Sequence, residues 1–333
     1  MPQPISVIGA GSWGTTLAVV LANKGYDTTL WVFESDQLAL LESERTNRKY
    51  LPGVMFPENL RLSGDLSAAT RSADYLVLVV PTHVMREVCL RIAPDVRPEQ
   101  IVINASKGIE NDTLKRMSEV IGENLPLDNR HIATLYGPSH AEEVSQEIPT
   151  AVVAASSDLS TARRVRDLFL TDYFRVYSSQ DIIGVEYGGS LKNVVAIAAG
   201  ICDGAGFGDN TKAALLTRAL AEISRMGVTM GAQPETFAGL SGIGDLIVTC
   251  MSKHSRNRHV GEQIGKGRTL QEVLDEMVMV AEGVRTTRSV HQLYRRHGVE
   301  MPIAEQVYQV LFHDKNPHTA MAELMTRDAK EED

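Results

Sequence analysis

The chain has 333 residues, of which 43% are hydrophobic and 23% are charged, and its formal net charge is −9. These proportions are close to globular averages and exclude a wholly disordered, collagen-like or disulfide-scaffold chain. At about 150 residues per domain, the length predicts two domains. The acidic balance excludes a global basic field, so we expect no nucleic-acid partner.

The three cysteines, Cys89, Cys202 and Cys250, lie far apart and form no C-x-x-C pair. They suit a reducing compartment and predict neither a metal site nor a disulfide framework. No segment reaches the roughly 18 consecutive apolar residues of a membrane helix. Because residues 1–5 also lack the basic region of a signal peptide, the sequence predicts a cytoplasmic protein with no membrane span.

Short β-rich runs alternate with helical patterns over the first half of the chain. The clearest run covers residues 75–80, and its unbroken apolar character is typical of a parallel strand buried on both faces. Similar runs occupy residues 5–8, 28–32, 101–103, 131–135, 151–154 and 174–177. Strands separated by helical stretches indicate βαβ units, so the fold class is α/β with an N-terminal Rossmann-like doubly wound sheet.

After about Gly184 the chain becomes rich in Ala, Leu, Glu and Arg and has few β-branched runs. Residues 211–226 form a strong helical pattern that ends at Gly227. We therefore expect a dinucleotide-binding domain over residues 1–186, followed by an all-α substrate-binding domain over residues 187–333.

The segment after the first predicted strand reads Gly9-Ala-Gly11-Ser-Trp-Gly14, which is the pattern G-x-G-x-x-G. Between a strand and a helix, this pattern indicates a dinucleotide site. Gly9 would make the tight turn, Gly11 would let the backbone approach the pyrophosphate, and Gly14 would let the helix pack closely on the strand. Ser12 and Trp13 begin the helix, whose N-terminal N–H groups favour an anion. The alternative is a glycine turn that binds no ligand.

Glu34 lies 20 residues after Gly14. An acidic residue at this spacing accepts from the ribose 2′-hydroxyl and favours NAD(H), whereas an arginine would accommodate the 2′-phosphate of NADP(H). Arg45, Arg48 and Lys49 are the nearby basic residues. The alternative for Glu34 is an exposed loop carboxylate.

Reactive side chains also follow two later strands and begin the second domain. Lys107 comes shortly after the run at 101–103, and Gly137 and Ser139 follow the next run. The carboxyl ends of such strands face the ligand crevice. Lys192 precedes a long apolar run, so we expect it in a partly dry cleft that suits general acid–base catalysis. The alternative is a lysine that reaches from a helix edge into solvent.

Two further motifs suit a small anionic substrate. Asp245 is presented by a glycine turn, and Ser255, Arg256 and Asn257 place a hydroxyl, a guanidinium and an amide in consecutive positions. This mixture of a charged fork and neutral donors fits a phosphate. Taken alone, the same residues are more often part of a solvated loop.

In this order, the motifs resemble those of bacterial NAD(P)-dependent glycerol-3-phosphate dehydrogenases, and the resemblance covers essentially the whole chain. Its most specific parts run from Glu186 to Asn193 and from Cys250 to Arg258. The resemblance implies reversible conversion of sn-glycerol 3-phosphate to dihydroxyacetone phosphate with NAD(H) or NADP(H). It further implies reduction as the usual direction, a supply of glycerol 3-phosphate for phospholipid biosynthesis, and a homodimer.

The resemblance also implies roles for single residues. It assigns proton exchange with the substrate C2 oxygen to Lys192, and contact with both cofactor and substrate to Lys107. It assigns further substrate contacts to Gly137, Ser139, Asp245, Ser255, Arg256 and Asn257. It assigns cofactor contacts to Gly9, Gly11, Ser12, Trp13, Gly14, Ala141, Arg256, Val280 and Glu282.

This sequence departs from the family pattern at two places. Phe33 and Glu34 stand where the family commonly has a basic residue or histidine, so we expect unusually good use of NADH. His140 replaces the familiar phenylalanine in the turn that contains Ser139.

Two other functions remain open from the residues alone. A β-hydroxyacid dehydrogenase has a similar domain plan and a catalytic lysine, but it would recognise a carboxylate. A non-catalytic dinucleotide sensor would need the glycine motif, but not Lys107, Lys192 and Asp245 together.

Overall fold

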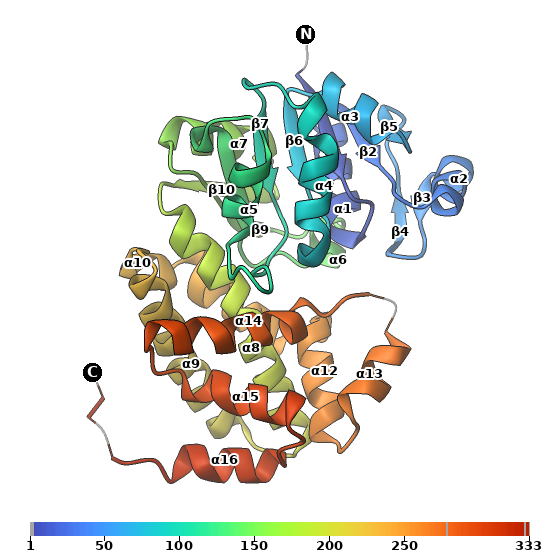
Figure 1. Cartoon of the computed structure of the whole chain (residues 1–333). Coiled ribbons are helices and arrows are strands. Elements are labelled where there is room, and N and C mark those ends of the chain that lie inside the picture. Colours follow the sequence, from blue (N-terminus) through green and yellow to red (C-terminus); the bar gives the residue numbers. More distant parts are fainter. Residues whose placement is uncertain (1–2, 278, 330, 333) are drawn as a thin grey trace. The chain divides into compact units, whose positions relative to one another are not determined.

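The computed structural model describes residues 3–277, 279–329 and 331–332 (Figure 1). The chain divides into two compact units. The first comprises Met1–Lys107 and Lys115–Glu186, and the second comprises Gly108–Leu114 and Tyr187–Asp333. The short segment 108–114 packs within the second unit, where the Ser289 hydroxyl donates to Asn111 Oδ1 at 2.6 Å.

The first unit is built on an eight-stranded sheet with the order β10-β9-β8-β7-β6-β1-β2-β5. Its strands are β1 (Pro4–Ile8), β2 (Asp27–Trp31), β5 (Leu60–Ser63), β6 (Tyr75–Leu78), β7 (Ile101–Asn104), β8 (Ile132–Tyr136), β9 (Thr150–Ala155) and β10 (Phe174–Ser179). A separate two-stranded sheet joins β3 (Thr46–Asn47) and β4 (Leu51–Met55).

Six neighbouring strands of the sheet pair in parallel, in the order β8-β7-β6-β1-β2-β5. This arrangement confirms the predicted Rossmann-like sheet. One end of the sheet differs, because β9 pairs antiparallel with β8 and in parallel with β10. The chain runs from β1 outward to β2 and β5, and then returns to β6 on the other side of β1. The loops that follow β1 and β6 therefore diverge, and such a switch point leaves the crevice in which α/β sheets bind ligands.

Helices cover both faces of this sheet (Figure 1). Helices α1 (Ser12–Asn23) and α7 (Leu159–Phe169) pack on one face, and α3 (Leu66–Ser72), α4 (Met85–Ile92) and α5 (Met117–Asn124) pack on the other. Every residue of β6, β7 and β8 is consequently buried, which explains why these strands consist mainly of apolar residues. Helices α2 (Ser35–Glu44) and α6 (Ala141–Val144) also belong to this unit.

The second unit is helical, as predicted. Its helices are α8 (Ile182–Gly204), which starts in the last residues of the first unit, α9 (Asp209–Thr229), α10 (Pro234–Phe237), α11 (Asp245–Met251), α12 (Arg256–Gly265), α13 (Leu270–Glu276), α14 (Glu282–His297), α15 (Pro302–Phe312) and α16 (Pro317–Met325). A π-helical turn, Leu240–Gly244, leads into α11.

Glycines let α8 and α12 pack backbone against backbone. A Cβ at Gly200 would lie 2.0 Å from the carbonyl oxygen of Arg258, and one at Gly261 would lie 2.0 Å from that of Ile197. No larger residue fits at either position without separating the helices. This close packing fixes the relative position of the two helices that carry Lys192 and Arg256.

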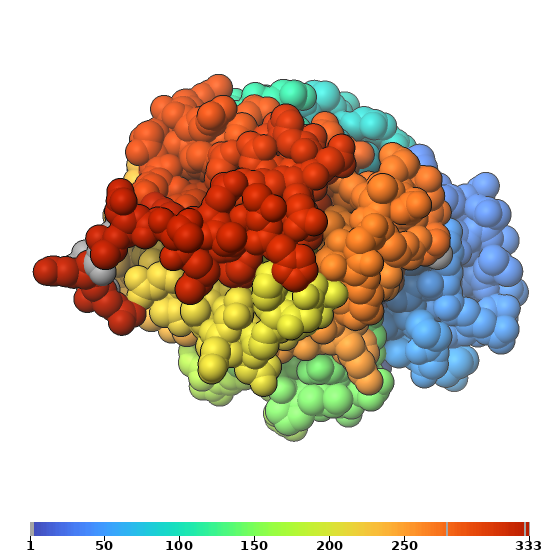
Figure 2. All heavy atoms as spheres, turned by 90° about the horizontal axis from the view of Figure 1, so that it is seen from below, coloured from blue at the N-terminus to red at the C-terminus, as the bar shows by residue number. Residues whose placement is uncertain are grey.

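The C-terminal helix packs beside the start of α9. The rings of Phe207 and His318 lie with their centroids 5.0 Å apart. Figure 2 shows this face of the helical unit, with α16 in red beside the yellow segment that enters α9. Among the described residues, no helix combines the length and the apolar character that crossing a membrane requires.

Candidate functional site

The glycine loop after β1 shows which of its glycines the fold itself requires. Gly9 has a φ of +119°, and a Cβ there would lie 2.6 Å from the carbonyl oxygen of Val79. A Cβ at Gly14 would lie 1.9 Å from the carbonyl oxygen of Gly9. At Gly11, by contrast, a Cβ would meet no atom within 4 Å. The protein's own packing does not explain Gly11, and the open space beside it is what backbone approach to a pyrophosphate requires.

The N-terminus of α1 carries no competing anion. Its N-cap is Gly11, which has no side chain to accept from the first turn, and the first turn contains no acidic residue. Asp65 and Asp158 cap α3 and α7 in the same unit with their side chains. The N–H groups and the dipole of α1 therefore suit a pyrophosphate. Ser12 and Trp13 are half-buried in this first turn, and the loop as a whole fits a dinucleotide.

Asn47 supports this loop, and sequence reasoning missed it. The side chain is buried, and its Nδ2 donates to the carbonyl of Ala10 at 2.9 Å and to Thr15 Oγ1 at 2.8 Å. Gln37 Nε2 donates to Asn47 Oδ1 at 3.1 Å, which fixes the orientation of the amide. Nothing in the local sequence marks Asn47, because Ala10 and Thr15 lie more than 30 residues away from it.

The structure places Glu34 at the end of β2, where it is the N-cap residue of α2. Its side chain is exposed and does not cap that helix. Phe33 beside it is 67% exposed, and the guanidinium of Arg91 lies 6.0 Å from the centroid of its ring. Of the nearby basic residues, Arg45 donates to two backbone carbonyls, and Arg48 pairs with the carboxylate of Glu44 at the end of α2.

Lys107, Gly137 and Ser139 meet at the carboxyl ends of β7 and β8. Lys107 Nζ donates to the Gly137 carbonyl at 2.8 Å, and the Ser139 hydroxyl donates to the same oxygen at 3.0 Å. Ala141 begins α6, and its carbonyl accepts from Thr16 Oγ1 of α1 at 3.4 Å. The structure thus brings these predicted substrate and cofactor residues together in the first unit.

Lys192 is the centre of the group in the helical unit. Its side chain is 7% exposed, and its Nζ donates to Asp245 Oδ1 at 2.9 Å and to Thr249 Oγ1 at 2.6 Å. The alternative of a lysine reaching into solvent is therefore wrong. The Thr249 hydroxyl donates to the Asp245 carbonyl at 2.6 Å, so it accepts from Lys192. An ammonium has three N–H groups, and the third has no acceptor among the described residues.

Sequence reasoning missed Thr249, although a signal was present. Thr249 lies one helical turn after Asp245 in α11, and residues four apart share a helix face. The neighbouring Cys250 is fully buried, and burial raises the pKa of its thiol to about 12. This cysteine therefore stays protonated, and it is not a candidate nucleophile.

The Ser255-Arg256-Asn257 segment forms the N-terminus of α12 and is not a solvated loop. Ser255 is the N-cap, and its Oγ accepts from the backbone N–H of Arg258 at 3.2 Å. Arg256 is exposed at the first helical position. The Arg258 guanidinium instead pairs with Asp203 at 2.6 Å. The sequence alone could not assign Asp203 of α8 as the partner of Arg258, since the two residues meet only in the fold.

Asn257 connects α12 to the start of α14. Its Nδ2 donates to Asn193 Oδ1 at 3.0 Å, and its Oδ1 accepts from the backbone N–H of Gly283 at 2.9 Å. Glu282, which precedes Gly283, is the first residue of α14, and Val280 is 38% exposed just before it. The predicted phosphate-side and cofactor-side residues of this unit are therefore linked by a buried amide.

Two family models match this chain, one over its N-terminal part and one over its C-terminal part. The family model described as the NAD-dependent glycerol-3-phosphate dehydrogenase N-terminus matches residues 4–162, and the model of its C-terminus matches residues 181–322. A glycerol-3-phosphate dehydrogenase [NAD(P)+] from Prosthecochloris aestuarii is 56% identical over 329 residues, which is 98% of this chain and 99% of that relative.

Solved structures extend the comparison. The crystal structure of a glycerol-3-phosphate dehydrogenase from Coxiella burnetii matches with a TM-score of 0.93 and 38% identity, covering 98% of this chain and 99% of that one. A ketopantoate reductase from Ralstonia eutropha matches with a TM-score of 0.60 at 13% identity, covering 96% of this chain and 99% of that one. The second likeness shows a shared fold alone.

We predict that Gly11→Val weakens NAD(P)H binding about tenfold or more, because the added side chain enters the open space beside α1. Titration of nicotinamide fluorescence measures the affinity. Gly208→Val is the matched control, since Gly208 is also an extended N-cap glycine, at α9, with no atom within 4 Å of its Cβ position. Unchanged affinity in a folded Gly11→Val protein would remove the assignment of the glycine loop.

Proposed function

The chain belongs to the NAD-dependent glycerol-3-phosphate dehydrogenase family, and from this premise we propose that it reduces dihydroxyacetone phosphate to sn-glycerol 3-phosphate for phospholipid biosynthesis. The enzyme is NAD(P)-dependent, and the reaction is a reversible oxidation–reduction. The observation that carries the proposal is the buried Lys192, which has two of its N–H groups held by Asp245 and Thr249.

Lys192 is the proposed proton donor in the reduction. When bound, the nicotinamide supplies the hydride that reaches C2 of the substrate. Lys192 gives a proton from its third N–H to the C2 oxygen, and it takes that proton back in the reverse direction. Asp245 balances the lysine charge in a buried place, and Thr249 fixes the direction of a second N–H. The remaining N–H would then be available to donate to the substrate oxygen.

The N-terminus of α12 is the proposed phosphate anchor. Arg256 offers a planar charged fork, and it is exposed where the first-turn N–H groups of the helix favour an anion. Ser255 uses its oxygen as the helix cap, which leaves its own O–H to donate. Binding energy from a phosphate remote from C2 positions the reacting carbon.

In the first unit, Lys107, Gly137 and Ser139 are the proposed contacts shared by substrate and dinucleotide. Gly9 to Gly14 would hold the pyrophosphate, and Ala141 would border it. In the helical unit, Asn257, Val280 and Glu282 complete the proposed set. The contacts of Asn257 with Asn193 and Gly283 support a role in holding these segments in place.

We further propose that NADH is used well. Glu34 is exposed at the end of β2 and repels a 2′-phosphate, while it can accept from a ribose 2′-hydroxyl. Arg45 is occupied by backbone carbonyls, and Lys49 is the nearby basic residue whose charge interacts with Glu34 and offsets part of this repulsion. On the basis of the family, we also propose a cytoplasmic homodimer.

Phosphate anchoring by Arg256 can be tested by mutation. Arg256→Ala is expected to lower kcat/KM for dihydroxyacetone phosphate about 30-fold or more, because charge-assisted contacts to the phosphate are lost. The variant should have a much smaller effect on dihydroxyacetone, which lacks the phosphate and is a poor substrate of the parent. Steady-state assays with both substrates measure the difference.

Lys253→Ala is the matched control for the Arg256 experiment, since it removes a nearby exposed positive charge outside the proposed anchor. Equal losses from Arg256→Ala on both substrates would exclude the anchor. Parent activity on a β-keto acid, but not on dihydroxyacetone phosphate, would favour a β-hydroxyacid dehydrogenase. Absence of turnover together with tight dinucleotide binding would favour a sensor.

The second prediction concerns cofactor choice. Glu34→Ala is expected to shift the ratio of kcat/KM for NADH over NADPH about tenfold toward NADPH, because a negative charge near the 2′-phosphate is removed. Asp36→Ala is the matched control, as Asp36 is an exposed carboxylate two residues further along. If the ratio does not change in Glu34→Ala, Glu34 does not discriminate between the cofactors.

A further inference from the structure

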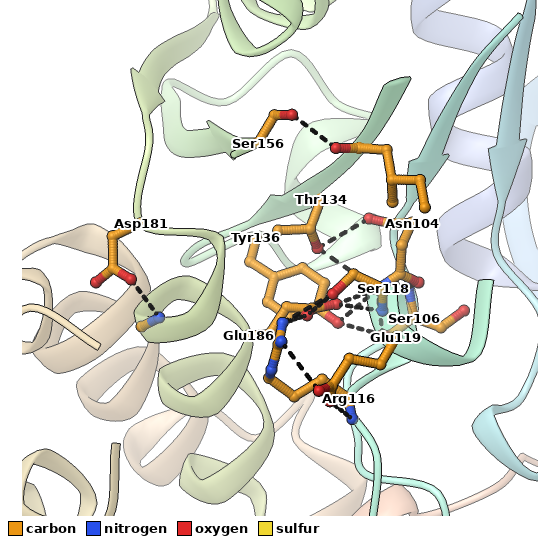
Figure 3. Close-up of polar contacts among 12 residues, drawn as sticks. Asn104, Ser106, Arg116, Ser118, Glu119, Thr134, Tyr136, Ser156, Asp181 and Glu186 are labelled. Atoms are coloured by element: carbon orange, nitrogen blue, oxygen red, sulfur yellow. Dashed lines mark hydrogen bonds and ion pairs between the residues drawn. The ribbon is translucent and has the colours of Figure 1, made fainter. Parts of the chain in front are cut away.

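Glu186 is a buried carboxylate that the proposed reaction does not use. It is 1% exposed, and its two oxygens accept from four donors. Oε1 accepts from the backbone N–H of Ser118 at 3.0 Å and from Asn104 Nδ2 at 3.1 Å. Oε2 accepts from Arg116 Nη1 at 2.8 Å and from the Ser118 hydroxyl. Figure 3 shows these side chains converging on Glu186 from two separate segments of the first unit, the end of β7 and the start of α5.

Burying a charged carboxylate costs desolvation free energy, so such a group adds little net stability to a fold. A buried ion pair often contributes no more stability than apolar residues of similar volume, although removing one partner is strongly destabilising. The four contacts of Glu186 satisfy its charge, but a leucine or methionine would avoid the desolvation altogether. The hydrogen bonds of Glu186 therefore point to a role other than stability, which is to hold neighbouring groups in place.

The carboxylate is one of the acceptors that determine which way the Asn104 amide faces. Asn104 is the last residue of β7, and its Nδ2 points at Glu186 Oε1 and at the Tyr136 hydroxyl, which lies at 2.9 Å. Its Oδ1 therefore faces the opposite way, where it accepts from the backbone N–H of Ser106 at 3.0 Å. A flipped amide would place an oxygen against the carboxylate. Glu186 thus holds the backbone of Ser106, one residue before Lys107.

The Tyr136 hydroxyl carries the same network to the neighbouring strand. It donates to the carbonyl of Ser106 and accepts from Asn104. Tyr136 ends β8 directly before Gly137, and Lys107 Nζ lies 5.7 Å from the centroid of its ring. Lys107 in turn donates to the Gly137 carbonyl at 2.8 Å. The network therefore leads from Glu186 to two residues of the proposed site.

We propose that Glu186 is a positioning residue, which holds the 104–107 segment so that Lys107 and Gly137 take the geometry needed to bind substrate and dinucleotide. This inference rests on the proposed function for the roles of Lys107 and Gly137. What matters is the hydrogen bond that Glu186 accepts from Asn104, and the ion pair with Arg116 is secondary. The two contacts can be separated by mutation.

The experiment compares Glu186→Met with Arg116→Met. Glu186→Met keeps the volume but has no acceptor, so it loses both the ion pair and the Asn104 bond. Arg116→Met loses the ion pair and keeps the Asn104 bond. We expect Glu186→Met to raise KM for dihydroxyacetone phosphate and Kd for NAD(P)H about tenfold or more. We expect Arg116→Met to change both by less than about threefold, although both variants lower Tm.

Two further variants keep the test decisive if Glu186→Met does not fold. Asn104→Ala breaks the same bond from the other end and should raise KM and Kd similarly. Glu186→Gln retains one acceptor oxygen that can serve Asn104, so it should stay near the parent values. A purely structural network would instead produce Tm losses in all four variants with no selective change in KM or Kd.

A readout without ligand separates this inference from the proposed function. Amide hydrogen exchange of the peptide containing residues 104–107 should be faster in Glu186→Met and Asn104→Ala, and near the parent rate in Arg116→Met. If the parent does not reduce dihydroxyacetone phosphate, the proposed function fails while this comparison still applies. The inference is overturned if exchange and NAD(P)H affinity are unchanged in folded Glu186→Met or Asn104→Ala, or change equally in Arg116→Met.

Discussion

A lysine can be buried as an ammonium only when its charge is paired and its N–H groups find acceptors. Lys192 meets this condition through Asp245 and Thr249, which lie four residues apart on one face of α11. The close packing of α8 on α12 fixes the helix that carries Lys192 beside the helix that begins at Arg256. The proposed proton donor and phosphate anchor therefore depend on one packing constraint, in which glycines let helix backbones touch.

In the first unit, buried polar side chains hold backbone segments of the proposed site in place. Its glycine loop and the ends of β7 and β8 are backbone structures, and buried amides and carboxylates hold them. Asn47 fixes the carbonyl of Ala10, and Asn104 fixes the N–H of Ser106. A polar side chain that is itself fully hydrogen-bonded can set a backbone group more precisely than apolar contact does. The backbone segments proposed to meet the ligand are thus held in place by buried polar side chains beneath them.

The sequence predicts the parts of this structure that arise from local pattern. Continuous apolar runs gave the central strands, and the spacing of Gly9 and Gly14 gave the strand–turn–helix unit, because periodicity and turn chemistry are local. The antiparallel pairing of β9 with β8 was not predictable, since both orientations bury the same apolar residues. Partners that meet only through the tertiary fold were also hidden. Examples are Asn47 beneath the glycine loop and Asp203 beside Arg258.

The most direct test of the proposed mechanism is the single-turnover rate of NAD(P)H oxidation when dihydroxyacetone phosphate is mixed with enzyme already holding the cofactor. Lys192→Met keeps a similar length but has no proton to transfer. We predict that its rate constant falls about 100-fold or more, while its affinity for NAD(P)H stays close to that of the parent. A near-parental rate constant in Lys192→Met would contradict the assignment of Lys192 as the proton donor.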